Sequence, residues 1–132
     1  MNIMAWDLQE RIVSHLQRWA TFRDANIAIY DSVPKKAPLP YVAIAESTIS
    51  PAATKINIGE NDSIVFHVWS NYKGKKEVMR IIKGLTAAIY ALPMELPENR
   101  KITFLTLENA NIIEQEEQGL FQGIVTFNFI IR

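Results

Sequence analysis

Asp62–Ser70 reads DSIVFHVWS and has the clearest strand pattern in the sequence. Alternate residues of this segment fall on two faces, and both faces are largely apolar. A strand that is apolar on both faces is typical of the centre of a sheet, where it is covered on both sides or packed against another subunit. We therefore expect a central strand here. One face holds Ile64, Phe66 and Val68, and the other holds Val65, His67 and Trp69.

The residues before this strand predict a helix and two shorter strands. Leu8, Ile12, Leu16, Trp19 and Ala20 recur at helical spacing, which predicts an amphipathic helix over Asp7–Phe22. Short apolar runs predict strands at Ile27–Tyr30 and Tyr41–Ala45. Three prolines between these strands predict a loop over Asp31–Pro40, because proline has a fixed φ and no N–H.

Ser47–Asn61 is a long polar segment just before the central strand. A structureless loop of this length is uncommon in a small domain unless it is functional. Ile56 and Ile58 alternate with Lys55 and Asn57, which is a strand-like pattern. The segment is therefore either a long loop or the two extended arms of a protruding hairpin.

The second half of the chain predicts a helix followed by strands. An apolar stripe predicts a helix over about Lys75–Ala91, which Pro93 ends. Three strands are expected at Ile102–Leu107, Ala110–Gln115 and Phe121–Ile131, with a turn at 116–119. The predicted order is α-β-β-β-α-β-β-β. We expect a single α+β domain over residues 1–132, with two helices on one face of an antiparallel-rich sheet of about five or six strands.

Composition narrows the function classes. The chain has 132 residues, with 14 Lys plus Arg against 14 Asp plus Glu, so its net charge is zero. This balance argues against nucleic-acid binding as the main role, because coating phosphates needs a basic excess. The absence of cysteine excludes disulfides, thiolate nucleophiles and Cys-ligated zinc. The uncharged stretch at 118–131 is strand-like, so we expect no membrane span. The first residues, 1–7, have no basic region and include an acid, so we expect no signal peptide and folding in the cytoplasm.

The sequence shows no catalytic signature. The glycines are scattered and form no phosphate-binding loop, and no Gly-x-Ser-x-Gly motif is present. His15 and His67 stand alone, without His-x-x-x-His or His-x-Glu spacing, and a structural role is expected for both. We therefore expect no catalytic residue, no cofactor and no metal site. The alternative is a small hydrolase that uses His67 and an acid.

Two clusters of charge remain. Lys76, Arg80 and Lys83 make a basic stripe at helical spacing, with Lys73 and Lys75 just before it. Lysines at a helix start are mildly unfavourable, which indicates a use such as pairing with an acidic neighbour. The candidate partner is the acidic turn formed by Glu114, Glu116 and Glu117, in the same chain or in another copy. A solvated face is the plain alternative, and a DNA-binding stripe would need affinity that falls steeply with salt.

Three segments together carry a family resemblance. The first is Ile29–Pro34 followed by Leu39–Ile44, and the second is the strand ending His67–Ser70, then a glycine and a helix. The third is the pair of C-terminal strands joined near Gly119, with Gly123 before the last strand residues. In this order and spacing they resemble the tail completion, or tail terminator, proteins of long-tailed bacteriophages and prophages. The resemblance covers nearly the whole chain.

The resemblance implies a structural role without catalysis. Such a protein caps the head-proximal end of the tail tube as a hexameric ring, and it helps to join the tail to the head connector. The implied partners are other copies of the chain, the tail tube protein and the connector or stopper protein. The implied location is the head-tail junction of the virion, after assembly in the bacterial cytoplasm. No membrane and no sequence-specific nucleic acid is expected, although DNA passes through the ring lumen.

A closed ring needs two different patches on each copy, and exposed sheet edges are a further means of joining copies. The candidate contact residues lie in the polar segment, the basic stripe and the acidic turn: Thr48, Ser50, Lys55, Asn57, Lys75, Lys76, Arg80, Glu114, Glu116 and Glu117. Two alternatives stay open. One is a related head-tail connector or tail component, and the other is a non-viral interaction module of the same fold.

Overall fold

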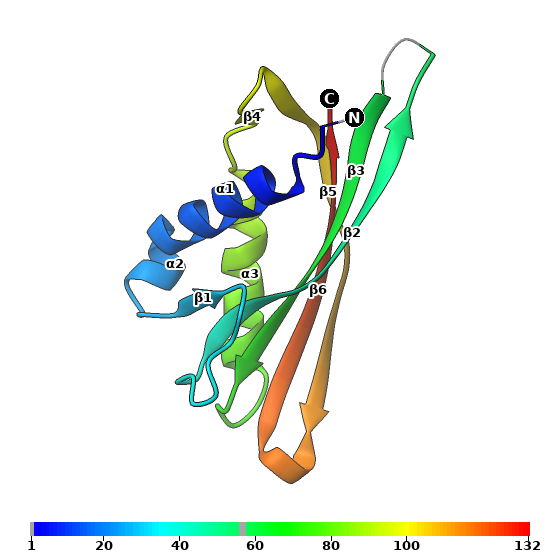
Figure 1. Ribbon diagram of the computed structural model, residues 1–132. Coiled ribbons are helices and arrows are strands. Elements are labelled where there is room, and N and C mark those ends of the chain that lie inside the picture. Colours follow the sequence, from blue (N-terminus) through cyan, green and yellow to red (C-terminus); the bar gives the residue numbers. More distant parts are fainter. Residues whose placement is uncertain (1, 56–57) are drawn as a thin grey trace.

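The computed structural model describes residues 2–55 and 58–132, and it has a mixed α+β fold. A sheet with the strand order β1-β2-β3-β6-β5-β4 carries the helices on one side (Figure 1). The strands are β1 (Ala28–Tyr30), β2 (Tyr41–Ala53), β3 (Ile58–Ser70), β4 (Glu95–Leu96), β5 (Arg100–Gln115) and β6 (Leu120–Ile131). The helices are α1 (Ala5–Arg18), α2 (Ala20–Arg23), α3 (Lys76–Tyr90) and the 3-10 turn η1 (Glu116–Gln118).

The predicted central strand lies at the centre of the sheet. β3 pairs antiparallel with β2 on one side and with β6 on the other. Ile64, Phe66 and Val68 are buried under the helices, as the alternation predicted. Val65, His67 and Trp69 are half-buried on the opposite face, which no helix covers in the described residues. Only one face of β3 is therefore part of the helix-covered core.

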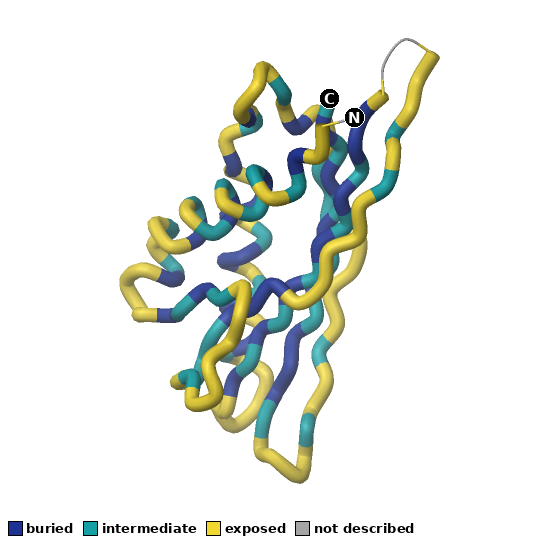
Figure 2. The backbone as a smooth tube through the Cα atoms, viewed as in Figure 1, coloured by how far each residue is buried: buried dark blue, intermediate teal, exposed yellow. Residues whose placement is uncertain are grey.

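In the core, the buried side chains of β3 and β6 pack against the helices. Phe66 and Phe127 meet edge to face with ring centroids 5.9 Å apart, and Phe127 also contacts Phe129 and Tyr90. Gly123 of β6 lies under α3, since a Cβ there would be 2.9 Å from the Ile82 Cδ1 atom. Figure 2 shows that burial is concentrated where the helices face the sheet, while the β2–β3 hairpin and much of β5 are exposed.

The first helix differs from the prediction. A single helix over Asp7–Phe22 was expected, but α1 ends at Arg18 and α2 begins at Ala20. Trp19 interrupts them with an extended backbone (ψ 132°). The apolar spacing continues through this break, so the periodicity could not reveal it. The kink places Thr21 directly against Gly84 of α3, where a Cβ on the glycine would be 2.5 Å from the Thr21 methyl group.

The polar segment before the central strand forms a hairpin. β2 continues to Ala53 and pairs with β3 as far as Ile58, so the two-arm alternative is correct and the long loop is not. A bulge between Ile44 and Glu46 shifts the register and lets β2 continue past the predicted strand end at Ala45.

In the second half of the chain, three strands follow α3, as predicted, but two of them occupy other residues than expected. Ile102–Leu107 and Ala110–Gln115 form one strand, β5, and a bulge between Leu107 and Asn109 accommodates the polar residues that suggested a break. A short strand, β4, precedes it and was not predicted. Glu98 and Asn99, both at positive φ, make the tight turn from β4 into β5.

We expect Phe127→Ala to lower the free energy of unfolding by about 3–5 kcal/mol, because it leaves a cavity among fully buried rings. Phe104→Ala is the matched control. Phe104 is 51% exposed, so its truncation should cost well under about 1 kcal/mol. Urea denaturation followed by circular dichroism measures both. Equal losses in the two variants would contradict the assigned core.

Candidate assembly surfaces

The first predicted surface is the β2–β3 hairpin. Thr48 and Lys55 are exposed, Ser50 is half-buried, and Asn57 lies outside the described residues. The last pair that joins β3 to β6 is Glu60 with Ile131, so the hairpin extends past the end of β6 (Figure 1). Arg132 anchors the base of the hairpin, where its Nη1 donates to the Ala52 carbonyl oxygen (2.9 Å). Exposed Ile58 (61%) makes this arm partly apolar.

The second surface is the start of α3. Lys75, Lys76 and Arg80 are exposed on its first two turns. The segment before the helix is tied to it, because the Ser70 hydroxyl donates to Glu77 Oε1 (2.6 Å) and accepts the Tyr72 N–H (3.2 Å). The basic stripe is thus a solvent-facing row on a fixed helix.

The third surface is the acidic turn between β5 and β6. Glu114 ends β5, Glu116 and Glu117 lie in η1, and all three are exposed. Gly119 closes the turn at φ 65°, a conformation that glycine adopts without steric cost. The turn is a solvated tip in this chain.

The structure brings the two charged surfaces to one end of the sheet and the hairpin to the other. Ser70 pairs with Phe121, so the loop that leads into α3 and the acidic turn both leave the sheet at this end. Figure 1 shows them at the bottom and the hairpin at the top. Among the described residues, the ion pair found is the exposed Arg23–Asp24 contact. The predicted pairing of the basic stripe with the acidic turn is therefore not made within the described part of one chain.

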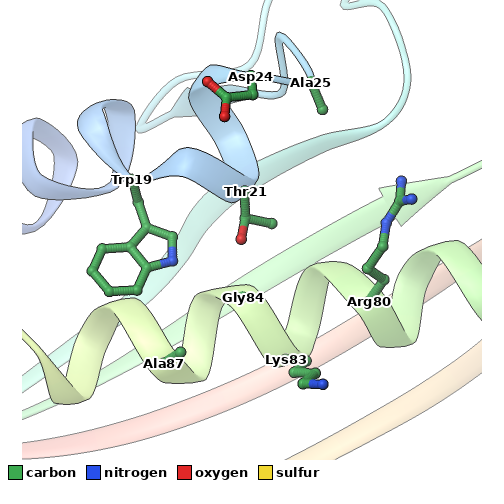
Figure 3. Close-up of a pocket in the computed structure, with 8 residues that line it drawn as sticks. All are labelled: Trp19, Thr21, Asp24, Ala25, Arg80, Lys83, Gly84 and Ala87. Carbon is green, nitrogen blue, oxygen red and sulfur yellow. The ribbon is translucent and has the colours of Figure 1, made fainter.

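A groove between α2 and α3 was not predicted. Trp19, Thr21 and Asp24 lie above α3, with Arg80 and Lys83 on the helix beside them (Figure 3). The groove has a volume of about 480 Å³, and small residues such as Gly84 line α3 there. A glycine in the middle of a helix was the available sequence signal, because such a glycine costs about 1 kcal/mol relative to alanine unless close packing requires it.

Both histidines take structural positions. The His15 Nε2 atom lies 2.8 Å from the Ala88 carbonyl oxygen, which links α1 to the end of α3. The His67 Nδ1 atom lies 3.3 Å from the Gln122 amide nitrogen. Burial lowers the pKa of His67, against the opposite effect of the Glu46 charge. No carboxylate hydrogen-bonds to either ring in the described residues, and these residues contain no cluster of three or more metal-ligating His, Asp or Glu.

One site that the sequence analysis missed lies at the base of the hairpin. Glu60 and Asp62 are fully buried on the helix-covered face of β3, two residues apart. Glu60 Oε1 accepts the Met4 N–H (2.7 Å), which fastens the start of α1 to the sheet. Within residues 2–55 and 58–132, no donor reaches Glu60 Oε2 or either Asp62 carboxylate oxygen. A proton on Asp62 would supply the donor that this pair lacks.

Burial raises the pKa of Asp62 to about 8, and the hydrogen bond that a protonated Asp62 would donate to Glu60 and the Glu60 charge act in the same direction. Between about pH 4 and about pH 8, the folded chain therefore keeps a proton that the unfolded chain releases. The stability that this group provides is complete at low pH and is lost as the pH rises to about 8.

We expect Asp62→Asn to raise the free energy of unfolding at pH 8 by about 1–3 kcal/mol, because the neutral amide can donate to Glu60 and adds no second buried negative charge. The variant should also flatten the decline in stability between pH 5 and pH 8. Thermal melts across this pH range measure both effects. Asp31→Asn, at an exposed aspartate, is the control, and an equal response in both variants would refute the buried acid pair.

The fold and most of this chain match known phage proteins. A family model described as "Tail completion protein gp17" matches residues 11–132. The chain belongs to this family. The tail completion protein gp17 of Bacillus phage SPP1 is 34% identical over 124 residues, which are 94% of this chain and 91% of that protein. The predicted family is thus confirmed, and the chain is a tail completion protein of the phage type, a structural component of the virion.

Solved structures agree with the assignment at the level of fold. The structure of bacteriophage SPP1 gp17 has a TM-score of 0.63 at 22% identity, and the match covers 98% of this chain and 95% of that one. A chain in the virion of a native gene transfer agent particle has a TM-score of 0.75 at 20% identity, with 99% and 98% covered. No helix among the described residues is long and apolar enough to cross a membrane.

Proposed function

We propose that this tail completion protein acts as a tail terminator. It forms a hexameric ring that caps the head-proximal end of the tail tube and joins the tail to the head connector. The observation that carries this proposal is the separation of the exposed surfaces. The hairpin leaves one end of the long sheet, and the basic stripe and acidic turn leave the other. A chain built in this way can contact one partner at each end.

The proposed role is structural rather than catalytic. The histidines are held by a backbone carbonyl and an amide, without a carboxylate partner in the described residues. The buried acids among the described residues, Glu60 and Asp62, are closed off from solvent, and Glu60 holds the N-terminus of α1. The location that follows from the proposal is the head-tail junction, after assembly in the bacterial cytoplasm.

The proposed ring encloses a lumen through which DNA passes, and the helix-free face of the sheet suits that lining. On this face the register of β2, β3, β5 and β6 places uncharged polar residues such as Thr48, Asn111, Thr126 and Asn128. We consider the part of this face that runs from Tyr41–Ser50 of β2, through the paired residues of β3 and β6, to Phe104–Gln115 of β5. Its paired residues include no lysine or arginine. Phosphates moving past would meet no cation that could hold them.

The proposal predicts binding at one end of the tail tube. We expect the protein, when added to tail tubes that lack it, to give density at one tube end only, with six-fold symmetry in end views. Negative-stain electron microscopy measures this directly. Binding along the tube wall would favour another tail component instead. An absence of binding by a chain that is folded by circular dichroism would contradict the terminator role.

The charged surfaces predict contacts between chains. We expect Lys76→Glu combined with Arg80→Glu to reduce ring formation by about tenfold or more without loss of fold, because like charges then meet the acidic turn of the neighbour. Adding Glu116→Lys and Glu117→Lys should restore rings. Lys35→Glu with Lys36→Glu changes the same charge on an exposed loop and is the control. Unchanged rings in the first variant would refute the charge pairing.

A further inference from the structure

The sheet has two long edges without a strand partner among the described residues. On its outer side β2 pairs with β1 only from Tyr41 to Ala43, so its edge is open from Ile44 onward. β4 pairs with β5 only at Arg100 and Lys101, and the Met94 carbonyl oxygen accepts the Ile102 N–H (2.8 Å). From Thr103 to Gln115 no strand of the described chain covers the outer edge of β5. An exposed strand edge of this length is a ready template for pairing with another chain.

The two open edges run in opposite directions, and they lie at the same level along the strand axis. β2 is antiparallel to β3, β3 to β6 and β6 to β5, so β5 runs antiparallel to β2. The registers also place them level with each other. Thr48 lies in one row with Ser63, Asn128 and Thr106, and Ser50 lies in one row with Phe104. If one copy is placed beside another by rotation about an axis parallel to the strands, the β2 edge of the first meets the β5 edge of the second as an antiparallel pair.

Side chains at these edges fit an interface and set its limits. Pro51 of β2 has no N–H, and proline is accommodated in strands at free edges, so pairing in this direction ends near Ser50. Phe104 on β5 and Ile49 on β2 are 51% and 42% exposed beside the open backbone. The Leu107 N–H on β5 donates to the Tyr90 hydroxyl oxygen (2.8 Å), which is a side-chain partner that a strand could replace.

We infer that copies of this chain join edge to edge, with β2 from Ile44 to Ser50 of one copy pairing antiparallel with β5 of the next. The occupant of each edge is a second copy, because the complementary edge is on the same molecule at the same height. The contact is heterologous, and in the proposed closed ring it makes the sheets of neighbouring copies continuous, with the helices on one side. This inference rests on the proposed ring and specifies how its copies are connected.

Cysteine cross-linking tests the pairing, since the chain has no cysteine of its own. Thr48→Cys is combined in turn with Phe104→Cys, Thr106→Cys and Asn109→Cys, whose positions all lie on the helix-free face. Within one chain these positions are three strands apart, about 14 Å, which is too far for a disulfide. Any disulfide between them must therefore join two copies.

We expect oxidation of the double variants, bound to tail tubes, to give disulfide-linked chains up to the ring size on non-reducing gels. Cross-linking should be strongest for one of the β5 positions, which defines the register. Thr48→Cys with Met79→Cys, at an exposed site on α3, should give at least tenfold less product. Each single-cysteine variant shows whether its substitution leaves tube binding intact.

The outcomes separate this inference from the proposed function. Rings at tube ends, seen by electron microscopy, with no cross-link above the Met79 control for any β5 position would overturn the edge pairing and leave the terminator role standing. Tubes without end density in the presence of the unmodified chain would overturn both. Cross-linked products that appear only in protein free of tubes would overturn the pairing as the contact of the assembled ring.

Discussion

The antiparallel pairing of β3 with β6 is the constraint on which the rest of the structure depends. It runs from Glu60 opposite Ile131 to Ser70 opposite Phe121, and it places the buried side chains of both strands on the same side of the sheet. These side chains include Phe66, Phe127 and Phe129, on which α3 packs. A shift of one residue would turn every buried side chain to the open face, so the core fixes this register. The outer strands and the helices are positioned relative to it.

The same pairing explains why the surfaces lie where they do. β2 and β3 are longer than β6 at the Ile131 end, so their hairpin projects beyond the core. At the Ser70 end, the chain must leave the sheet to begin α3, and β5 must turn into β6. Charged residues gather in these turns because no packing covers them. The buried pair Glu60 and Asp62 lies at the base of the projecting arm, where α1 also begins, and it links the hairpin to the helical layer.

Sequence reasoning found the parts of the candidate surfaces that are local in the chain. The exposed basic stripe on α3 follows from helical spacing, and the acidic turn follows from the residues at 114–119. The fact that both lie at one end of the sheet depends on which strands pair, and a single sequence does not specify that. The groove under Trp19 and the buried acids depend on contacts between residues that are far apart in the chain, Thr21 with Gly84 and Met4 with Glu60. The strand pattern places Asp62 at the start of a strand, and alternation alone gives no reason for an acid to be buried there.

By itself, the sequence determined the alternating core face of β3, the apolar stripe of α3, the strand β6 and the family. These are periodic or local patterns, and burial of one apolar face directly stabilises the elements that carry them. Only the tertiary structure decided the break at Trp19, the continuous β5 with its bulge, the short β4 and the two open strand edges. Each of these depends on backbone geometry or on a distant partner, and different arrangements of those partners are compatible with the same local pattern of apolar and polar residues.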